Sequence, residues 1–251
     1  MLATVLLLVT RQSSVQTFRV GDLDRQAIVV QPSVAVRTAE PLVFVFHGHG
    51  GNMRQAERSF GIEKLWPEAL VVYPQGLPTK GITDPSGTKN GWQQKKGDYG
   101  DRDLAFFDAM LRSLEANNHV DPSRIYVTGH SNGGRMTYLL WEERGDVFAA
   151  VAPSSSPSIG MVRFFKPLPA FIVAGERDEI VPFRTQKLSI DLVRRRLGTD
   201  ATKAKVDGYT TLEPGPNGLE LGTYIYPGPH SIPQPAIAQI VAFFKRHRKP
   251  D

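Results

Sequence analysis

The sequence predicts an α/β fold built on one doubly wound, mostly parallel sheet with helices on both faces. Short β-branched and aromatic runs alternate with helix-compatible stretches over most of the 251 residues. Some of these runs, such as 42–46, are apolar without interruption, which is typical of parallel strands covered on both faces. Another run, 125–128, leads through a glycine-flanked turn directly into a helical stretch. Together these patterns favour a single α/β domain.

The predicted domain covers residues 15–251 and follows a possible degenerate signal or leader at 1–14. The apolar run 2–9 is too short to span a bilayer and suits a signal-peptide core, but no basic region precedes it and no clear cleavage site follows. An added strand or a disordered leader is the alternative. We expect a secreted or periplasmic protein, otherwise a cytoplasmic one, with no stable membrane insertion. The oligomeric state is not readable from the sequence.

Composition excludes several classes of protein. The chain carries a net charge of +5 and no cysteine, so disulfides, thiol nucleophiles and thiolate metal sites are excluded. Basic residues cluster only at 194–196 and 245–249, without accompanying aromatics or a reading helix, and we therefore expect no nucleic-acid partner.

The first half of the domain opens with an antiparallel hairpin whose turn holds Gly21 and Asp22. In chain order, the expected elements are strands 15–20 and 25–30, a buried strand 42–46, a helix near 54–65 and a buried strand 69–73. The stretch from Gln75 to Gly100 has no periodicity and is expected to form a long surface loop of functional importance. Trp92 in this loop is predicted to pack over the site or the substrate, the alternative being a loop anchor in the core.

The second half continues the alternation of strands and helices. Asp101 and Asp103 precede apolar residues with helical spacing, and capping of that helix is their first expected role. The following elements are expected at 125–128 (strand), 135–143 (helix), 147–151 and 169–174 (strands), 185–197 (helix), 209–212 and 219–226 (hairpin) and 236–245 (helix).

Residues Gly129-His130-Ser131-Asn132-Gly133 match the pattern G-x-S-x-G between a strand and a helix. Such a turn holds the serine in a strained backbone conformation, and the two glycines leave room for the close crossing of the chain. The Ser131 hydroxyl would then lie above the sheet edge, with the next backbone N–H directed at the reaction centre. Because the pattern also arises by chance, its interpretation depends on the remaining residues.

Two further groups fall at the carboxyl ends of predicted strands, where the sites of open α/β sheets gather. His230 can serve as the base that activates Ser131, and Asp178 can orient that base. The chain order Ser, Asp, His is the order of the α/β-hydrolase fold. Glu176 and Glu179 are rivals, but Asp178 better fits an acid at a strand end followed by a turn.

The glycine-rich stretch 47–52 follows the buried strand 42–46. Its free backbone N–H groups are suited to holding an oxyanion, although a plain strand-to-helix loop is the alternative. The dinucleotide pattern G-x-G-x-x-G is not met. His47 and His49 have no third ligand at suitable spacing, so we expect no metal site.

Taken together, the motifs resemble those of the polyhydroxybutyrate depolymerase-like esterases, a family that also includes feruloyl and acetyl xylan esterases. The motifs are His47-Gly-His-Gly-Gly, Tyr73-Pro-Gln-Gly, Gly91-Trp92, Asp103-Leu-Ala-Phe, Asp121 through Gly133, Asp178-Glu-Ile-Val-Pro and Gly228-Pro-His230. The resemblance is collinear from Val15 to Phe244. It departs from the family where paired aspartates appear here as Arg102-Asp103, which affects the packing behind Trp92, and in lacking the family's cysteines.

The resemblance implies a serine esterase with an α/β-hydrolase fold. Ser131 would be the nucleophile, Asp178 and His230 its partners, and the backbone N–H groups of His49 and Asn132 the oxyanion hole. It implies no cofactor, and a small-molecule or polysaccharide-linked ester as substrate, of feruloyl, acetyl or short hydroxyalkanoate type. A peptidase of the same fold and a non-catalytic binding protein on the same scaffold are the alternatives.

Overall fold

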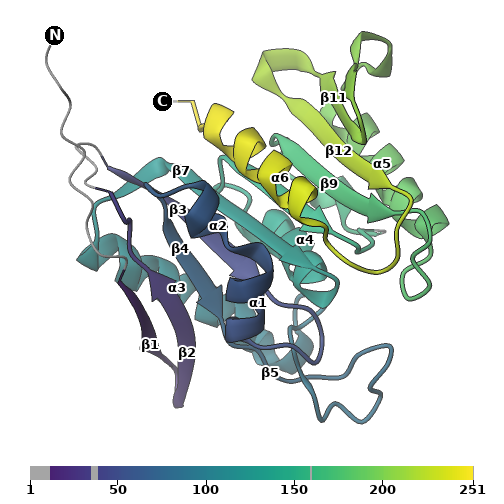
Figure 1. The fold of residues 1–251 in the computed structure, drawn as a ribbon. Coiled ribbons are helices and arrows are strands. Elements are labelled where there is room, and N and C mark those ends of the chain that lie inside the picture. The colour runs from purple at the N-terminus through teal and green to yellow at the C-terminus, as the bar shows by residue number, and fades with distance from the viewer. Residues whose placement is uncertain (1–11, 35–38, 159, 251) are drawn as a thin grey trace, which may run out of the picture.

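The computed structural model describes residues 12–34, 39–158 and 160–250, so the possible signal at 2–9 lies outside the described residues. Its main feature is a 10-stranded sheet of order β1-β2-β4-β3-β7-β8-β9-β12-β11-β10 (Figure 1). The central strands from β4 to β12 pair in parallel, and the pairs at both edges are antiparallel. The predicted doubly wound, mostly parallel sheet with an N-terminal antiparallel hairpin is confirmed.

The bounds of the elements follow the predicted runs closely. The strands of the main sheet are β1 Ser13–Val20, β2 Leu23–Val30, β3 Glu40–Phe46, β4 Leu70–Pro74, β7 Val120–His130, β8 Ala150–Ser154, β9 Ala170–Gly175, β10 Lys205–Asp207, β11 Thr210–Pro214 and β12 Glu220–Tyr226. The α-helices are α1 Met53–Phe60, α2 Ile62–Leu65, α3 Arg102–Asn117, α4 Asn132–Arg144, α5 Phe183–Leu197 and α6 Gln234–Arg246.

Two hydrophobic layers enclose the sheet. Along β3, Leu42, Phe44 and Phe46 belong to one apolar cluster, whereas Val43 and Val45 belong to the other. Alternate side chains of a strand point to opposite faces, so a strand covered on both sides needs an unbroken apolar run. Helices α3, α4 and α5 contribute to the first cluster, and α1, α2 and α6 to the second. In Figure 1, α1 and α6 lie on the near side of the sheet.

Several details differ from the sequence-based expectations. The helix expected near 54–65 is two helices, because Gly61 adopts the left-handed conformation with φ 53° and ends α1. The strand expected at 147–151 lies at 150–154, and the short strand β10 was not expected. None of the helices among the described residues is long and apolar enough to cross a membrane.

The capping role expected of Asp101 and Asp103 is wrong. Asp101 is the residue before α3, but its side chain makes no capping hydrogen bond. Instead, the side-chain oxygen of Gln93 accepts from the backbone N–H groups of Asp103 and Leu104, at 2.9 and 3.3 Å. The Asp103 carboxylate is buried and pairs with Arg25, with 2.9 Å between Nη2 and Oδ1. The long loop and the N-terminal hairpin therefore meet at the start of α3.

Candidate active site

Ser131 occupies the turn between β7 and α4 with φ 58° and ψ −119°, a region that side chains rarely adopt. Its backbone N–H donates to the Ser154 carbonyl at 2.9 Å. The flanking glycines are required by space: a Cβ atom on Gly133 would lie 2.1 Å from the Phe46 carbonyl oxygen, and one on Gly129 would lie 2.5 Å from the Gly133 backbone. The strained turn anticipated from the G-x-S-x-G pattern is therefore present.

Three residues that are far apart in the chain form a continuous hydrogen-bonded series. His230, in the loop after β12, places Nε2 2.8 Å from the Ser131 Oγ and Nδ1 2.7 Å from the Asp178 Oδ2. Because an ionised carboxylate only accepts hydrogen bonds, the Nδ1–H of the neutral ring faces Asp178. This tautomer leaves the Nε2 lone pair directed at the serine hydroxyl.

Asp178 follows β9 and its side chain is fully buried. Its Oδ1 accepts from the backbone N–H groups of Ile180 and Val181, at 2.9 and 2.8 Å, and its Oδ2 accepts from Gln186 Nε2 at 2.9 Å. These donors compensate for the burial of a charge and fix the position of the carboxylate. The neighbouring rivals Glu176 and Glu179 are exposed to solvent.

Two side chains that hold Asp178 and the His230 loop in place, those of Gln186 and Tyr226, were not identified from the sequence. Gln186 lies on α5, eight residues after Asp178, and no local pattern distinguishes it from other polar helix residues. The Tyr226 hydroxyl at the end of β12 lies 2.8 Å from the carbonyl oxygens of both Pro229 and Ser231. It therefore tethers the loop on either side of His230. A tyrosine at a strand end is a weak signal for such a role.

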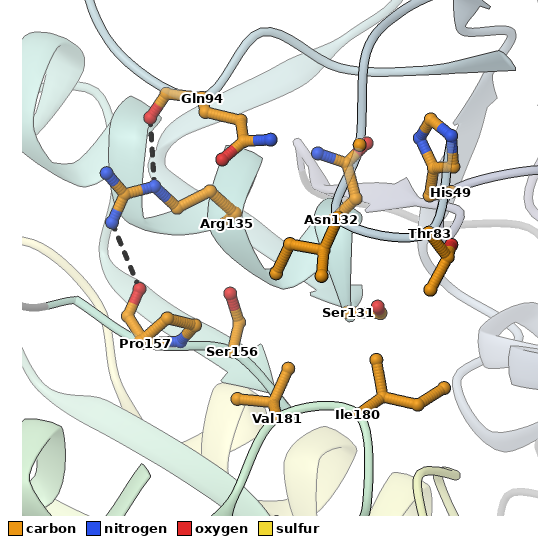
Figure 2. A pocket seen from close by; sticks show the side chains of 12 residues that line it. His49, Thr83, Gln94, Ser131, Asn132, Arg135, Ser156, Pro157, Ile180 and Val181 are labelled. Atoms are coloured by element: carbon orange, nitrogen blue, oxygen red, sulfur yellow. Dashed lines mark hydrogen bonds between the residues drawn. The ribbon is translucent and has the colours of Figure 1, made fainter. Parts of the chain in front are cut away.

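A pocket of about 280 Å³ opens beside Ser131 (Figure 2). The side chains that line the pocket are apolar, polar and basic, and none of the described lining residues carries a carboxylate. They comprise the apolar Ile82, Pro157, Ile180 and Val181, the polar Thr83, Gln94, Asn132 and Ser156, and the basic His49 and Arg135. Figure 2 shows Ile180 and Val181 on one side of Ser131 and Asn132 on the other.

Arg135 closes the far end of this pocket. Its Nε donates to the Gln94 carbonyl at 2.9 Å and its Nη1 to the Pro157 carbonyl at 3.1 Å, so it bridges the two loops that form the walls. Burial lowers the pKa of its guanidinium. Because the side chain is held by carbonyl oxygens, its charge has no carboxylate partner among the described hydrogen bonds and ion pairs.

The backbone N–H groups of His49 and Asn132 were predicted from the family resemblance to form an oxyanion hole. His49 lies in the glycine-rich loop after β3, and Asn132 is the first residue of α4. Both line the pocket together with Ser131. Neither N–H donates to another group that the structure describes. The free N–H at the start of a helix is favoured for anion binding because the helix dipole adds to its partial charge.

Two other histidines near the site are held neutral by burial. Burial lowers the pKa of His47 to about 4 and that of His130 to about 3. His47 donates from Nδ1 to the Gly48 carbonyl at 2.8 Å and accepts at Nε2 from the Gly76 N–H at 3.0 Å. The His130 ring packs against the His230 ring with 4.8 Å between their centroids. Neither ring has the carboxylate partner that His230 has.

Trp92 was predicted to pack over the site or the substrate, with a loop anchor in the core as the alternative. Its side chain is completely buried and does not line the pocket. The indole packs edge-on against Phe46, with 4.9 Å between ring centroids, and its Nε1–H donates to the His47 carbonyl at 2.8 Å. The core-anchor alternative describes its position, because an indole with an available carbonyl partner can be buried without leaving its N–H unpaired.

No group of three or more potential metal-binding side chains occurs among the described residues. His49 instead lies 3.3 Å from the Asp84 carboxylate through Nε2. That carboxylate also accepts hydrogen bonds from the Lys89 N–H, Ser86 and Thr88, which hold the pKa of Asp84 well below its usual range. Asp84 thus organises the loop from Thr79 to Lys89.

The chain is similar to known proteins both in sequence and in fold. In sequence, the prolyl oligopeptidase family matches residues 82–167, which is well under half of the chain. A probable feruloyl esterase C from Aspergillus clavatus is 33% identical over 143 residues, covering 57% of this chain and 50% of that protein. A putative esterase, NocK, from Nocardia uniformis subsp. tsuyamanensis is 32% identical over 155 residues, covering 59% and 43%. The match thus spans about half the length of these relatives.

Among solved structures, the acetyl xylan esterase from Aspergillus awamori superposes with a TM-score of 0.73 at 14% identity, covering 92% of this chain and 99% of that one. An acylaminoacyl peptidase in complex with a chloromethyl ketone superposes with a TM-score of 0.67 at 14% identity, covering 96% and 42%. At such identities the likeness shows the fold alone. The chain has the α/β-hydrolase fold, as predicted. The predicted resemblance to feruloyl esterases is confirmed by sequence similarity.

Proposed function

We propose that this protein is a serine esterase that hydrolyses carboxylic esters through a covalent acyl-enzyme. The observation that carries the proposal is the hydrogen-bonded series Ser131, His230 and Asp178 on a strained turn beside a pocket. A serine hydroxyl is a poor nucleophile unless a base takes its proton, and that base works best when a carboxylate orients it. Similarity to proteins named feruloyl esterase and esterase supports ester hydrolysis.

In the proposed first half-reaction, the Ser131 Oγ attacks the ester carbonyl carbon while His230 Nε2 takes the hydroxyl proton. The buried Asp178 carboxylate stabilises the resulting imidazolium. The carbonyl oxygen becomes an oxyanion and accepts hydrogen bonds from the N–H groups of His49 and Asn132. When the tetrahedral intermediate collapses, His230 gives its proton to the leaving alcohol.

In the second half-reaction, His230 takes a proton from water, and the resulting nucleophile attacks the acyl-serine carbonyl. The same N–H groups bind the second oxyanion. As this intermediate collapses, His230 returns the proton to the Ser131 Oγ, and the carboxylic acid is released. This sequence uses only side chains and backbone groups of the chain and proceeds without a cofactor.

The proposed substrate is a feruloyl, acetyl or short hydroxyalkanoate ester, free or linked to a polysaccharide. The mixed lining of the pocket supports an acyl group with both apolar and polar atoms. Ile180 and Val181 offer apolar contact, while Gln94 and Thr83 can reach hydroxyl or carbonyl groups of a bound ester. A secreted or periplasmic location stays a prediction, since the N-terminal run lies outside the described residues.

A peptidase is the second candidate, favoured by the match of residues 82–167 to the prolyl oligopeptidase family. Recognition of a free peptide amine would call for a carboxylate, and the described lining of the pocket has none. Recognition of a peptide carboxylate would fall to Arg135, whose guanidinium is already engaged with two carbonyl oxygens. The lining therefore favours an ester over a peptide.

The test compares purified wild type, Ser131→Ala and the control Ser156→Ala on acetyl, feruloyl and 3-hydroxybutyryl esters and on matched p-nitroanilides. Ser156 lies in the same pocket without joining the hydrogen-bonded series. We expect ester hydrolysis with kcat lower by a factor of about 10⁴ or more in Ser131→Ala and nearly unchanged in Ser156→Ala. Preference for anilides would favour the peptidase. A folded wild type with no turnover would favour a binding protein.

A further inference from the structure

Trp92 makes hydrogen bonds on the side of each proposed oxyanion donor: one to the His47 carbonyl near His49, and others to the side chain of Asn132. His49 and Asn132 belong to elements more than eighty residues apart in sequence, so their separation is not set by local geometry. An oxyanion hole requires both N–H groups at hydrogen-bond distance from one oxygen position, and small displacements weaken it. Contacts of Trp92, and of Asn90 two residues before it, reach Asn132 and the residues on either side of His49.

The first donor, His49, is bracketed by two hydrogen bonds to this short stretch of the long loop. The Trp92 Nε1–H donates to the His47 carbonyl at 2.8 Å, and the Gly50 N–H donates to the Asn90 carbonyl at 2.7 Å. Gly50 has φ 77°, and the surrounding glycines leave the backbone many conformations. Fixing the chain on both sides of His49 therefore selects one orientation of its peptide N–H.

The second donor, Asn132, is held by the backbone of Trp92 itself. The Asn132 Oδ1 accepts from the Trp92 N–H at 2.7 Å, and its Nδ2 donates to the Trp92 carbonyl at 3.1 Å. This pair of hydrogen bonds fixes both the first residue of α4 and the peptide of Trp92. Gly91 permits the approach, because a Cβ atom there would lie 2.6 Å from the His49 Nδ1 and 2.8 Å from the Asn132 Oδ1.

Trp92 is in turn anchored from behind. The Gln93 N–H donates to the Asp103 Oδ2 at 2.8 Å, and Asp103 is paired with the buried Arg25. Since the Gln93 side chain also caps α3, the stretch is attached to a helix and to the N-terminal hairpin. Because the stretch around Trp92 is fixed in this way, its contacts can hold both donors in place.

We propose that Trp92 is a positioning residue that sets the geometry of the oxyanion hole by holding His49 and Asn132 at a fixed separation. This inference rests on the proposed esterase function. Trp92 does not touch the substrate. Its indole N–H acts on the His49 side and its backbone on the Asn132 side, so its loss reduces stabilisation of the tetrahedral intermediate more than it reduces substrate binding.

The test is the substitution Trp92→Phe, which keeps a buried aromatic ring and removes the indole N–H. The matched control is Trp141→Phe: Trp141 is also completely buried, and its Nε1–H likewise donates to a backbone carbonyl, that of Lys166 at 2.7 Å, away from the pocket. Each variant is assayed for kcat and KM, and for inhibition by a trifluoromethyl ketone that forms a tetrahedral adduct with the serine.

Removal of one oxyanion-hole donor typically costs about 10² to 10³ in kcat, and a donor that is displaced rather than removed should cost about tenfold or more. We expect Trp92→Phe to lose kcat by that factor with KM within about twofold, and to bind the trifluoromethyl ketone more weakly by a matching factor. Trp141→Phe should retain both. If Trp92→Phe fails to fold, Asn132→Ala tests the other link, because it keeps the backbone N–H and should show the same split.

Equal effects of the two tryptophan substitutions, or a change confined to KM, would overturn the positioning role while leaving the esterase proposal intact. A folded wild type that hydrolyses no ester and forms no adduct would overturn both, since there would then be no oxyanion to position.

Discussion

The turn at Ser131 and the long loop from Gln75 to Gly100 both shape the candidate site, but by different physical means. The turn depends on backbone space: its glycines pass so close to neighbouring carbonyls that any side chain would clash. The long loop depends on polar side chains that reach distant parts of the fold. Asp84 organises its tip, and Gln93 and Trp92 connect its end to α3, Arg25 and Asn132.

The difference explains why the turn could be predicted from the sequence and the packing of the long loop could not. Gly129 and Gly133 stand within five consecutive residues, so the pattern is visible in the chain even though the backbone that excludes a side chain at Gly133 belongs to Phe46. The partners of Trp92 lie as much as 45 residues away. A loop without periodicity can therefore be as well ordered as a strand, provided its polar groups find buried partners.

The largest effect is expected for Gly133→Ala, which tests the steric basis of the turn. The added Cβ would lie 2.1 Å from the Phe46 carbonyl oxygen, and backbone cannot yield as a side chain can. We expect the free energy of unfolding to fall by more than about 4 kcal/mol, or the chain to fail to fold. Urea denaturation followed by circular dichroism measures the loss.

Gly100→Ala in the long loop is the matched control. Gly100 has φ 66° with open space around the position of a Cβ, so only the backbone preference is lost, at about 1–2 kcal/mol. Equal losses for the two variants would contradict the steric account of the turn.

A smaller but still large effect is expected for Asp103→Asn, which tests the anchor of the long loop. The change leaves the Arg25 guanidinium buried without a carboxylate, and burial already lowers the pKa of that arginine. Breaking a buried ion pair by removing one partner costs about 3–5 kcal/mol. Chemical denaturation at neutral pH should show a loss of this size.

Asp24→Asn supplies the comparison with an exposed pair. Asp24 pairs with Arg19 at 3.1 Å, and both side chains are more than half exposed, so the expected loss is at most about 1 kcal/mol. A loss for Asp103→Asn no greater than this one would show that the loop is not anchored through its buried carboxylate.

The smallest effect concerns His47, which connects the glycine-rich loop after β3 to the long loop through its contacts with Gly48 and Gly76. Burial lowers the pKa of His47 from the ordinary value of 6.5 to about 4. Between these two pH values the imidazole is therefore protonated in the unfolded chain and neutral in the folded chain. The stabilising contribution is present above pH 6.5 and is lost as the pH falls toward 4, by about 3 kcal/mol in total.

His47→Gln should therefore flatten the decline of stability between pH 6.5 and pH 4, whatever its effect at neutral pH. Free energies of unfolding measured by urea titration at several pH values give the two slopes. Parallel slopes for wild type and variant would contradict the assignment of a buried neutral ring at this position.

The sequence was a good guide to the candidate site where residues sit at strand ends. Because the carboxyl ends of parallel strands share one edge of the sheet, Ser131, Asp178 and His230 could be expected together, and the structure brings them within hydrogen-bond distance. It did not distinguish between the two positions considered for Trp92, whose indole N–H donates to the distant His47 carbonyl, and no local pattern marks Gln186.

The alternation of the main strands and helices and the position of the glycine-flanked turn could be predicted from the sequence alone. Each leaves a pattern among residues a few positions apart in the chain, such as an unbroken apolar run or two closely spaced glycines. Folding, by contrast, decides that Asp103 pairs with Arg25 and that Trp92 contacts the His47 carbonyl and Asn132. Polar partners of this kind are set by which donors and acceptors lie within about 3 Å after folding, and spacing along the chain does not encode that distance.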